Sequence, residues 1–337
     1  MCSGFFVARN MQVLVHSPTP THLRRLATAL QRGALVAIPT ETVYGLAAHA
    51  LDAKACRAIF RAKRRPANDP LIVHVLDLAE AEQLAEFNDP ARRLARRFWP
   101  GPLTLVLPKK ILVPGVVTSG GLTVAIRAPA HPLARRLLRL AGIPLAAPSA
   151  NLFGYISPTT AAHVREGLGR RIPHLLDGGA CPVGVESTVL DVTNPGKARI
   201  LRPGAVTSAQ LERFLGRKVS TARSRHPKAQ QLAPGMLERH YSPRTPLVLR
   251  RPAGRLPAGV AAVFLRQPGK KKPPHTFWLS RRGALKEVAR NLYEVLRRAD
   301  AGGYRQIWVE PLPADSGGLA AAIHDRLKRA AAEKRGR

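Results

Sequence analysis

The sequence is short of cysteine, aromatic residues, acidic residues and long apolar runs, and each shortage excludes a class of protein. Its 337 residues include three scattered cysteines, Cys2, Cys56 and Cys181, with no Cys-x-x-Cys pair. This argues against a disulfide framework and a cysteine zinc site, and it fits a reducing cytoplasm. No apolar run approaches the roughly 20 residues of a membrane-spanning helix, so no membrane contact is expected. The first ten residues make a poor signal peptide, and Met11 is an alternative start.

Several common motifs for nucleotides, metals and hydrolysis are also missing. The chain has no G-x-x-x-x-G-K-[ST] phosphate loop, and no G-x-G-x-x-G follows an apolar strand. It lacks H-E-x-x-H, paired-histidine spacing and G-x-S-x-G, so we expect neither a metal held by protein ligands nor a hydrolase elbow. Any nucleotide site must therefore be built from dispersed loops and cations.

The shortage of acidic residues leaves a strongly basic chain. There are 54 Lys and Arg against 21 Asp and Glu, a net charge of +33. Such an excess favours a polyanionic partner, and RNA is the natural candidate. Against this, the basic residues are spread along the chain, and 5% aromatic residues make stacking surfaces for single-stranded RNA sparse. The sequence therefore leaves direct contact with RNA open.

A polar loop after an apolar strand gives the clearest site signal. Residues 39–46 read Pro-Thr-Glu-Thr-Val-Tyr-Gly-Leu and follow the apolar run 34–38. Proline cannot extend a paired strand, and glycine permits a sharp turn. The loop is therefore expected to present four polar side chains, Thr40, Glu41, Thr42 and Tyr44.

A second cluster of polar residues spans residues 63–74. Lys63, Arg64 and Arg65 end a helix predicted over residues 53–62, with Asp52 as its cap. The helix dipole favours cations at this end, so a solvated helix terminus explains them as well as a phosphate-binding cluster does.

Three further loops border apolar strands. Residues 148–151, Pro-Ser-Ala-Asn, follow one strand, and Ser157 with Pro158 is expected to cap the next helix. Residues 184–189 lead into another strand, and residues 199–204 end a third. Taken singly, neither serine needs a functional role. A helix cap explains Ser157, and an ordinary position in a strand explains Ser187.

The apolar periodicity predicts two α/β domains. We divide the chain into an N-terminal segment 1–20, a domain 21–216, a linker 217–246 that lacks periodicity, and a smaller domain 247–337. The first domain should alternate strands near 34–38, 71–75, 103–107, 123–127, 144–147, 187–192 and 199–201 with helices over 23–31, 53–62, 79–87, 91–98, 132–140, 158–166 and 209–215. The second should have strands near 247–249, 260–265 and 306–310 and helices near 284–299 and 318–332.

Taken in order, these loops resemble those of the threonylcarbamoyl-AMP synthases, whose catalytic module is the YrdC-type domain. The resemblance runs from about Thr21 to Leu215 and continues through linker motifs at 233–236, Ala-Pro-Gly-Met, and 240–243, His-Tyr-Ser-Pro. It extends to the final run 322–327, Ala-Ile-His-Asp-Arg-Leu. It implies a YrdC-like twisted mixed sheet with helices, followed by a linker and a smaller Rossmann-like α/β domain.

The resemblance also implies a reaction. L-threonine, bicarbonate or CO2, and ATP would give L-threonylcarbamoyl-AMP and pyrophosphate. The product would pass to a separate tRNA threonylcarbamoyltransferase in the cytoplasm, and direct contact with tRNA stays open. Mg2+ is expected to accompany ATP, with oxygen ligands from the phosphates rather than from an acidic cluster.

The resemblance assigns site residues by motif position. It makes Lys63 and Arg65 catalytic. It places Thr42, His74, Arg127, Ala147 and Ser187 at L-threonine, and Arg65, Asp69, Thr123, Ser149, Ser157, Arg202 and Tyr241 at ATP. Because Tyr241 lies in the linker, residues 233–243 are expected to close over ATP as a lid.

Three positions depart from the family pattern. Asp69 stands where the family usually has asparagine, Phe153 where a small hydroxyl residue is common, and Arg64 where glycine is frequent. Two other functions compete with the synthase. The charge favours a non-catalytic tRNA- or RNA-binding protein of the same fold. A hydrogenase-maturation carbamoyltransferase would contain a related domain but normally adds paired-cysteine zinc modules, which this chain lacks.

Overall fold

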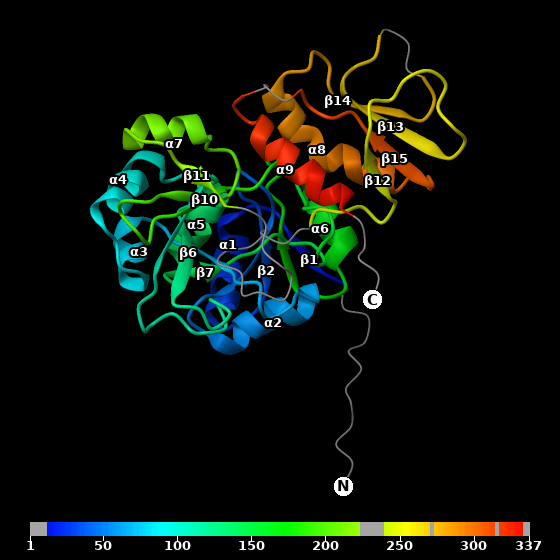
Figure 1. The fold of residues 1–337 in the computed structure, drawn as a ribbon. Helices are drawn as coiled ribbons and strands as arrows, with labels where there is room; N and C mark the ends of the chain where they lie inside the picture. Colours follow the sequence, from blue (N-terminus) through cyan, green and yellow to red (C-terminus); the bar gives the residue numbers. More distant parts are fainter. Residues whose placement is uncertain (1–11, 223–238, 270–272, 314–316, 333–337) are drawn as a thin grey trace.

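The computed structural model describes residues 12–222, 239–269, 273–313 and 317–332. Within these residues it contains two α/β units (Figure 1). The larger unit, blue to green, is built on an 11-stranded sheet, and the smaller unit, yellow to red, on a 4-stranded sheet. The predicted fold class, a mixed α/β sheet followed by a smaller α/β domain, is confirmed. No helix in the described part of the chain is long and apolar enough to cross a membrane.

The large sheet mixes parallel and antiparallel pairs in the order β1-β8-β2-β3-β7-β4-β6-β5-β9-β10-β11. At its centre β4 and β6 are parallel, and β7 and β5 flank them in antiparallel orientation. Its strands are β1 Leu14–His16, β2 Val36–Ile38, β3 Gly45–His49, β4 Ile72–His74, β5 Leu103–Pro108, β6 Thr123–Arg127, β7 Leu145–Ala146, β8 His174–Leu176, β9 Thr188–Asp191, β10 Arg199–Arg202 and β11 Ser220–Thr221.

Most helices of the larger unit begin at side-chain caps that the sequence provides. Asp52, Asp77 and Asn88 each accept hydrogen bonds from backbone N–H groups in the first turn of their helices. These bonds satisfy donors that a helix start leaves unpaired, which fixes where the helices begin. The helices are α1 Pro20–Gln31, α2 Ala53–Lys63, α3 Leu78–Leu84, α4 Asp89–Phe98, α5 Pro132–Ala141, α6 Ala161–Leu168 and α7 Ser208–Leu215.

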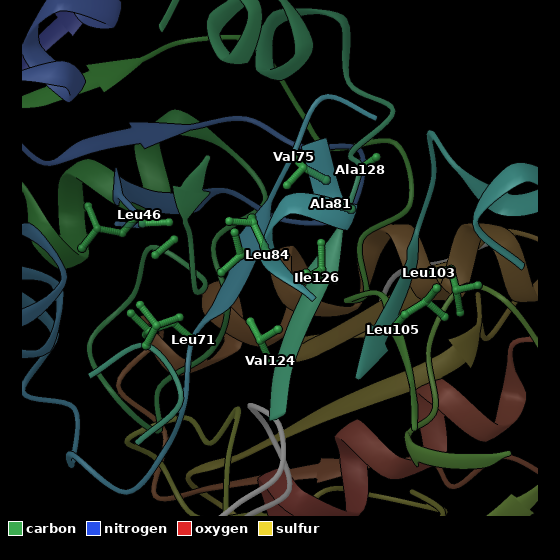
Figure 2. Close-up of a cluster of buried hydrophobic side chains, with 14 of the residues drawn as sticks. Leu46, Leu71, Val75, Ala81, Leu84, Leu103, Leu105, Val124, Ile126 and Ala128 are labelled. Atoms are coloured by element: carbon green, nitrogen blue, oxygen red, sulfur yellow. The ribbon is translucent and has the colours of Figure 1, made fainter. Parts of the chain in front are cut away.

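Alternate residues of the central strands face opposite sides of the sheet, as the period of two requires. On one side Leu105 and Ile126 join the main apolar core, together with residues of α3 such as Leu84 (Figure 2). On the other side Val36 packs with α1 and α5, and Ile72 packs with neighbouring strands. The side that carries Ile72 also carries the candidate site.

One sequence prediction is wrong, and several strands were missed. Helix α6 begins at Ala161, with Thr160 as its N-cap, so Ser157 and Pro158 do not start it. Ser157 donates instead to the carboxylate of Glu186 at 2.6 Å. The strands β1, β3, β8, β11 and β14 were not predicted. They are short or poor in β-branched residues, so their patterns resemble loops.

The smaller unit has an all-parallel sheet in the order β12-β15-β13-β14, with two helices. Its elements are β12 Leu247–Leu249, β13 Val260–Arg266, β14 Thr276–Ser280, β15 Gln306–Val309, α8 Leu285–Asp300 and α9 Ala320–Ala331. Its apolar core takes in Val43, Ile156 and Val185 of the larger unit, and Tyr241 of the connecting segment. The apolar core of the smaller unit therefore extends into the larger unit.

A glycine allows the close approach of the two units. Gly184 has a φ of +80°, and a Cβ there would lie 2.4 Å from the Cα of Arg290 in α8. Only glycine combines that backbone with such close packing. The linker motif at 233–236 lies outside the described residues, whereas the motif at 240–243 lies within them.

Candidate functional site

A small cavity lies on the face of the large sheet that carries Ile72. The strands β4 and β6 are parallel, and their register pairs His74 with Arg127 at the carboxyl ends, so both side chains project from one face. The cavity measures about 40 Å3, room for about three water molecules. It is lined by Thr40, Thr42, Val43, Gly45, Arg65, Ile72, His74, Arg127, Ala147, Pro148, Ser149, Glu186, Ser187, Arg202, His240 and Tyr241.

Arg127 is fixed against the wall of the cavity by three partners. Its Nε donates to the carbonyl oxygen of Gly101 at 3.2 Å, and its Nη1 donates to Oγ1 of Thr42 at 3.0 Å. Its Nη2 lies 2.5 Å from Oε1 of Glu41. Burial raises the pKa of Glu41, but the Arg127 charge and hydrogen bonds outweigh it and lower that pKa overall. The guanidinium is therefore a rigid donor beside the Thr42 hydroxyl.

His74 is a neutral acceptor beside Arg127. Its Nδ1 lies 3.3 Å from the carbonyl oxygen of Ile72, which can only accept, so we assign the ring proton to Nδ1 and a lone pair to Nε2. Burial, followed by the Arg127 charge, lowers the pKa of His74 from 6.5 to about 3. A ring with this pKa accepts hydrogen bonds but is too weak a base to deprotonate an ammonium group at neutral pH.

Arg65 lines a second part of the cavity wall, and Lys63 is buried close to it. Arg65 Nε donates to the carbonyl oxygen of Asp69 at 2.9 Å, and Nη2 lies 2.9 Å from Oδ2 of the same buried residue. The Nζ of Lys63 donates to the carbonyl oxygens of Asn151, at 2.6 Å, and Ser149. Burial, followed by the Arg65 charge, lowers the pKa of Lys63 well below its usual value. Such crowding of positive groups favours an anionic ligand.

Arg202 and Ser187 form the adjoining wall. Nη2 of Arg202 donates to the carbonyl oxygen of Ser187 at 3.0 Å and to its Oγ at 3.1 Å. The same Oγ lies 2.8 Å from Oγ1 of Thr104 on β5. A Cβ at Gly204 would lie 2.3 Å from the backbone nitrogen of Thr188, so glycine lets the loop after β10 contact the start of β9. This close contact sets the position of Arg202.

His240 and Tyr241 of the connecting segment line one side of the cavity. Tyr241 is buried with a φ of 61°, a conformation that costs energy for any residue but glycine. Its ring stacks on Tyr293 of α8, with centroids 5.8 Å apart and planes inclined by 24°. His240 packs edge-on against Phe153, at 5.8 Å. The Tyr241 hydroxyl has no hydrogen-bond partner within the described part of the chain.

The structure gathers nine of the thirteen predicted site residues around this cavity. These are Thr42, Arg65, His74, Arg127, Ala147, Ser149, Ser187, Arg202 and Tyr241. The other four do not line it. Lys63 and Asp69 are buried partners of nearby groups, Ser157 donates to Glu186, and Thr123 lies at the opposite end of β6 from Arg127, about 13 Å along the strand.

Sequence reasoning did not assign a role to Glu186, Glu41 or Thr40, and it placed His240 only within the lid segment 233–243. Glu186 lines the cavity, and its carboxylate accepts hydrogen bonds from Ser157, Tyr293 and Arg326. The available signal was a lone acid in the hydroxyl-rich loop 184–189. Among the residues that the structure describes, no group of three or more His, Cys, Asp or Glu could hold a metal ion.

Comparison with known proteins places the chain in a family. A family model described as "Telomere recombination" matches residues 28–204, and one described as "Threonylcarbamoyl-AMP synthase, C-terminal domain" matches residues 206–332. The threonylcarbamoyl-AMP synthase of Pyrococcus abyssi is 41% identical, with 91% of this chain and 93% of that protein covered. The Bacillus subtilis protein of the same name is 39% identical, with 94% of each covered.

A solved structure agrees over nearly the whole chain. The crystal structure of Pyrococcus abyssi Sua5 complexed with L-threonine matches with a TM-score of 0.85 and 37% identity, covering 95% of this chain and 98% of that one. The fold and the site thus define a two-domain enzyme of the nucleotidyltransferase type. The chain belongs to the threonylcarbamoyl-AMP synthase family, which acts in the modification of tRNA. The predicted family and enzyme class are confirmed over the non-catalytic alternative.

Proposed function

We propose that the chain makes L-threonylcarbamoyl-AMP from L-threonine, bicarbonate or CO2, and ATP. The threonine amine adds to the carbon of CO2 and loses a proton, which forms an N–C bond and a carbamate. A carbamate oxygen then attacks the α-phosphorus of ATP. A new P–O bond forms, the bond from the α-phosphorus to the bridging oxygen breaks, and pyrophosphate leaves with the electron pair.

One observation carries this proposal: a single cavity combines three arginines with neutral hydroxyl and imidazole groups. Arg65, Arg127 and Arg202 all line it, and each is buried. A threonine needs one cation for its carboxylate and neutral acceptors for its polar groups, whereas a triphosphate needs several cations. The two requirements are met by different parts of the wall.

Around Arg127 the wall suits an amino acid. The Arg127 guanidinium would pair with the threonine carboxylate, and the lone pair of His74 would accept from the hydroxyl or the amine. The backbone of Ala147 adjoins β4, with its N–H bonded to the carbonyl oxygen of Ile72 at 2.9 Å. Because His74 is so weak a base, the proton released when the carbamate forms would go to solvent or bicarbonate rather than to this ring.

Around Arg65 and Arg202 the wall suits phosphate. Both guanidinium groups would bind phosphate oxygens, with Ser149 and Tyr241 as neutral donors. Lys63 stays a predicted catalytic residue, and Asp69, Ser157 and Thr123 stay predicted ATP-site residues. Lys63, Asp69 and Ser157 do not line the cavity themselves. They would act by holding Ser149, Arg65 and Glu186, which do line it.

Catalysis would then consist mainly of positioning and charge stabilisation, because in-line attack on phosphorus needs little covalent help. ATP would enter as its Mg2+ complex, with the ion held chiefly by phosphate oxygens. A labile carbamate also needs protection from water, and a cavity closed by Tyr241 would provide it.

The product would pass to a separate tRNA threonylcarbamoyltransferase, since threonylcarbamoyl transfer needs its own site for the acceptor adenosine. Direct contact between this chain and tRNA stays a prediction that rests on the net charge of +33.

The proposal is tested by pyrophosphate release from ATP in the presence of bicarbonate and different amino acids. L-threonine should support release, and L-serine should support it about tenfold less well, because one buried methyl is worth about 1.4 kcal/mol. Equal release with and without threonine would overturn the proposal.

A further inference from the structure

A buried carboxylate joins the two domains at the wall of the cavity. Glu186 lines the cavity and is almost inaccessible to solvent. Its Oε1 accepts from Oγ of Ser157 at 2.6 Å. Its Oε2 accepts from the hydroxyl of Tyr293 on α8 at 2.8 Å and from Nε of Arg326 on α9 at 2.7 Å. One side chain of the catalytic domain is thus held by two side chains of the C-terminal domain.

This carboxylate is electrostatically out of place beside a phosphate site. It lines the same cavity as Arg65 and Arg202, and an uncompensated negative charge there would repel a triphosphate. Burial raises the pKa of Glu186, but Arg326, and Arg202 after it, bring that pKa down to about 2. Glu186 is therefore ionised at neutral pH, and its charge must be balanced within the protein.

Arg326 supplies the balancing cation from the C-terminal domain. It is fully buried and also contacts Asp325 at 2.7 Å, but Asp325 has a second cation, Arg329, at 2.9 Å. Loss of Arg326 would therefore leave mainly Glu186 without a partner. Arg202 would then have to compensate Glu186, at the expense of any phosphate that it binds.

Arg326 also supports Tyr241, which lines the cavity. Its guanidinium carbon lies 5.0 Å from the centre of the Tyr241 ring, which also stacks on Tyr293. A guanidinium this close to an aromatic face attracts it. The same two residues of α8 and α9 therefore hold both Glu186 and Tyr241.

We propose that Arg326 is a positioning residue for nucleotide: it neutralises Glu186 and holds Tyr241, so that the C-terminal domain sets the affinity of the catalytic domain for ATP. This inference rests on the proposed function for the identity of the ligand. It gives the C-terminal domain a role in the reaction through charge balance, without contact between Arg326 and substrate.

The alternative is that Arg326 merely joins the domains, and a matched control on α8 separates the two. Nε2 of His163 on α6 lies 2.8 Å from a carboxylate oxygen of Glu294 on α8, another polar contact between the units, and neither residue lines the cavity. Glu294→Ala should therefore weaken the domain contact without changing the affinity for ATP.

The experiment is calorimetric titration of the full-length chain with MgATP and, separately, with L-threonine. Arg326→Met should raise the Kd for ATP about tenfold, equivalent to about 1.4 kcal/mol, and change the Kd for threonine by less than about threefold. The double variant Arg326→Met/Glu186→Gln removes both charges and should return the Kd for ATP to within about threefold of the original value. A purely structural role would instead weaken the binding of ATP and of threonine together.

The charge-preserving variant Arg326→Lys covers the case in which Arg326→Met does not fold. It keeps the cation but loses the planar contact with Tyr241, so the Kd for ATP should rise about threefold while that for threonine stays unchanged. Equal changes for both ligands, no change for ATP, or failure of the double variant to recover would overturn the proposal. Because binding is measured without turnover, these outcomes are independent of whether threonine-dependent pyrophosphate release is found.

Discussion

At the scale of single residues, the pairing of Arg127 with Glu41 changes how Arg127 must be tested. Removal of Arg127 alone leaves a buried carboxylate without a cation, which typically costs about 3–5 kcal/mol of stability. This loss of stability would be mistaken for a loss of threonine binding. The neutral variant Glu41→Gln provides a background in which Arg127 can be replaced without that penalty.

In this background we predict that Arg127→Ala weakens threonine binding by about 2–4 kcal/mol, because a charge-assisted bidentate contact is lost. The KM for ATP should change little, since Arg65 and Arg202 occupy a different part of the wall. Calorimetry with L-threonine is the measurement, with Glu41→Gln alone as the control. Unchanged threonine affinity would show that Arg127 does not bind the carboxylate.

The buried His74 makes stability depend on pH. Its pKa of about 3 lies below the 6.5 of an unperturbed histidine, so between these values the unfolded chain binds a proton that the folded chain does not. The stability that this provides is complete above pH 6.5 and is lost as the pH falls towards 3, at about 1.4 kcal/mol per pH unit.

We therefore predict that His74→Gln flattens the fall in unfolding free energy between pH 6.5 and 5. Urea unfolding at several pH values measures this slope. His324→Gln, a change at an exposed position on α9, should leave the slope as it is. A His74→Gln slope equal to that of the parent chain would mean that His74 is protonated in the folded state.

At the scale of secondary structure, the end of α2 explains one departure from the family pattern. Arg64 is the C-cap of this helix and adopts the left-handed conformation, with φ 53° and ψ 40°. Glycine reaches this conformation without steric cost, whereas other residues lose about 1 kcal/mol or more. The glycine common at this position in the family is thus explained by backbone geometry.

Arg64→Gly should accordingly stabilise the protein by about 1 kcal/mol, measured as the free energy of unfolding in urea. Arg61→Gly, three residues earlier and inside the helix, should instead destabilise it by about 1 kcal/mol. Equal signs for the two variants would contradict the geometric explanation.

The sequence predicted elements well where capping residues and apolar periodicity agree, as in α2 and β6. It failed at Ser157, because Pro158 and the hydroxyl resemble a helix start while Thr160 supplies the actual cap. It also gave no role to Glu186, because the partners Tyr293 and Arg326 are more than 100 residues away. Contacts between the two domains leave no local pattern in the chain.

At the scale of the whole molecule, we expect the segment around Tyr241 to move when ATP binds, because this segment lines the cavity. A volume of about 40 Å3 accommodates about three water molecules, far less than ATP. His240 and Tyr241 of the connecting segment line this cavity. That residues 233–243 act as a lid stays a prediction, and residues 233–238 lie outside the described part of the chain.

We predict that trypsin cleaves after Arg239 or Arg244 rapidly without ligand and slowly with ATP and threonine together. The bound substrates would hold the segment closed and hide these bonds. Threonine alone should protect less, because Tyr241 is predicted to contact the nucleotide. Cleavage rates that do not respond to either ligand would reduce the segment to a simple connector.

The central claim concerns the whole enzyme: one cavity joins threonine, inorganic carbon and ATP. The most direct measurement is mass spectrometry of the product formed with 13C-labelled bicarbonate, combined with measurement of pyrophosphate. The account predicts threonylcarbamoyl-AMP that carries the label, with one pyrophosphate released per molecule and none without threonine. Pyrophosphate release that does not need threonine, or an adenylate that lacks the labelled carbon, would contradict it.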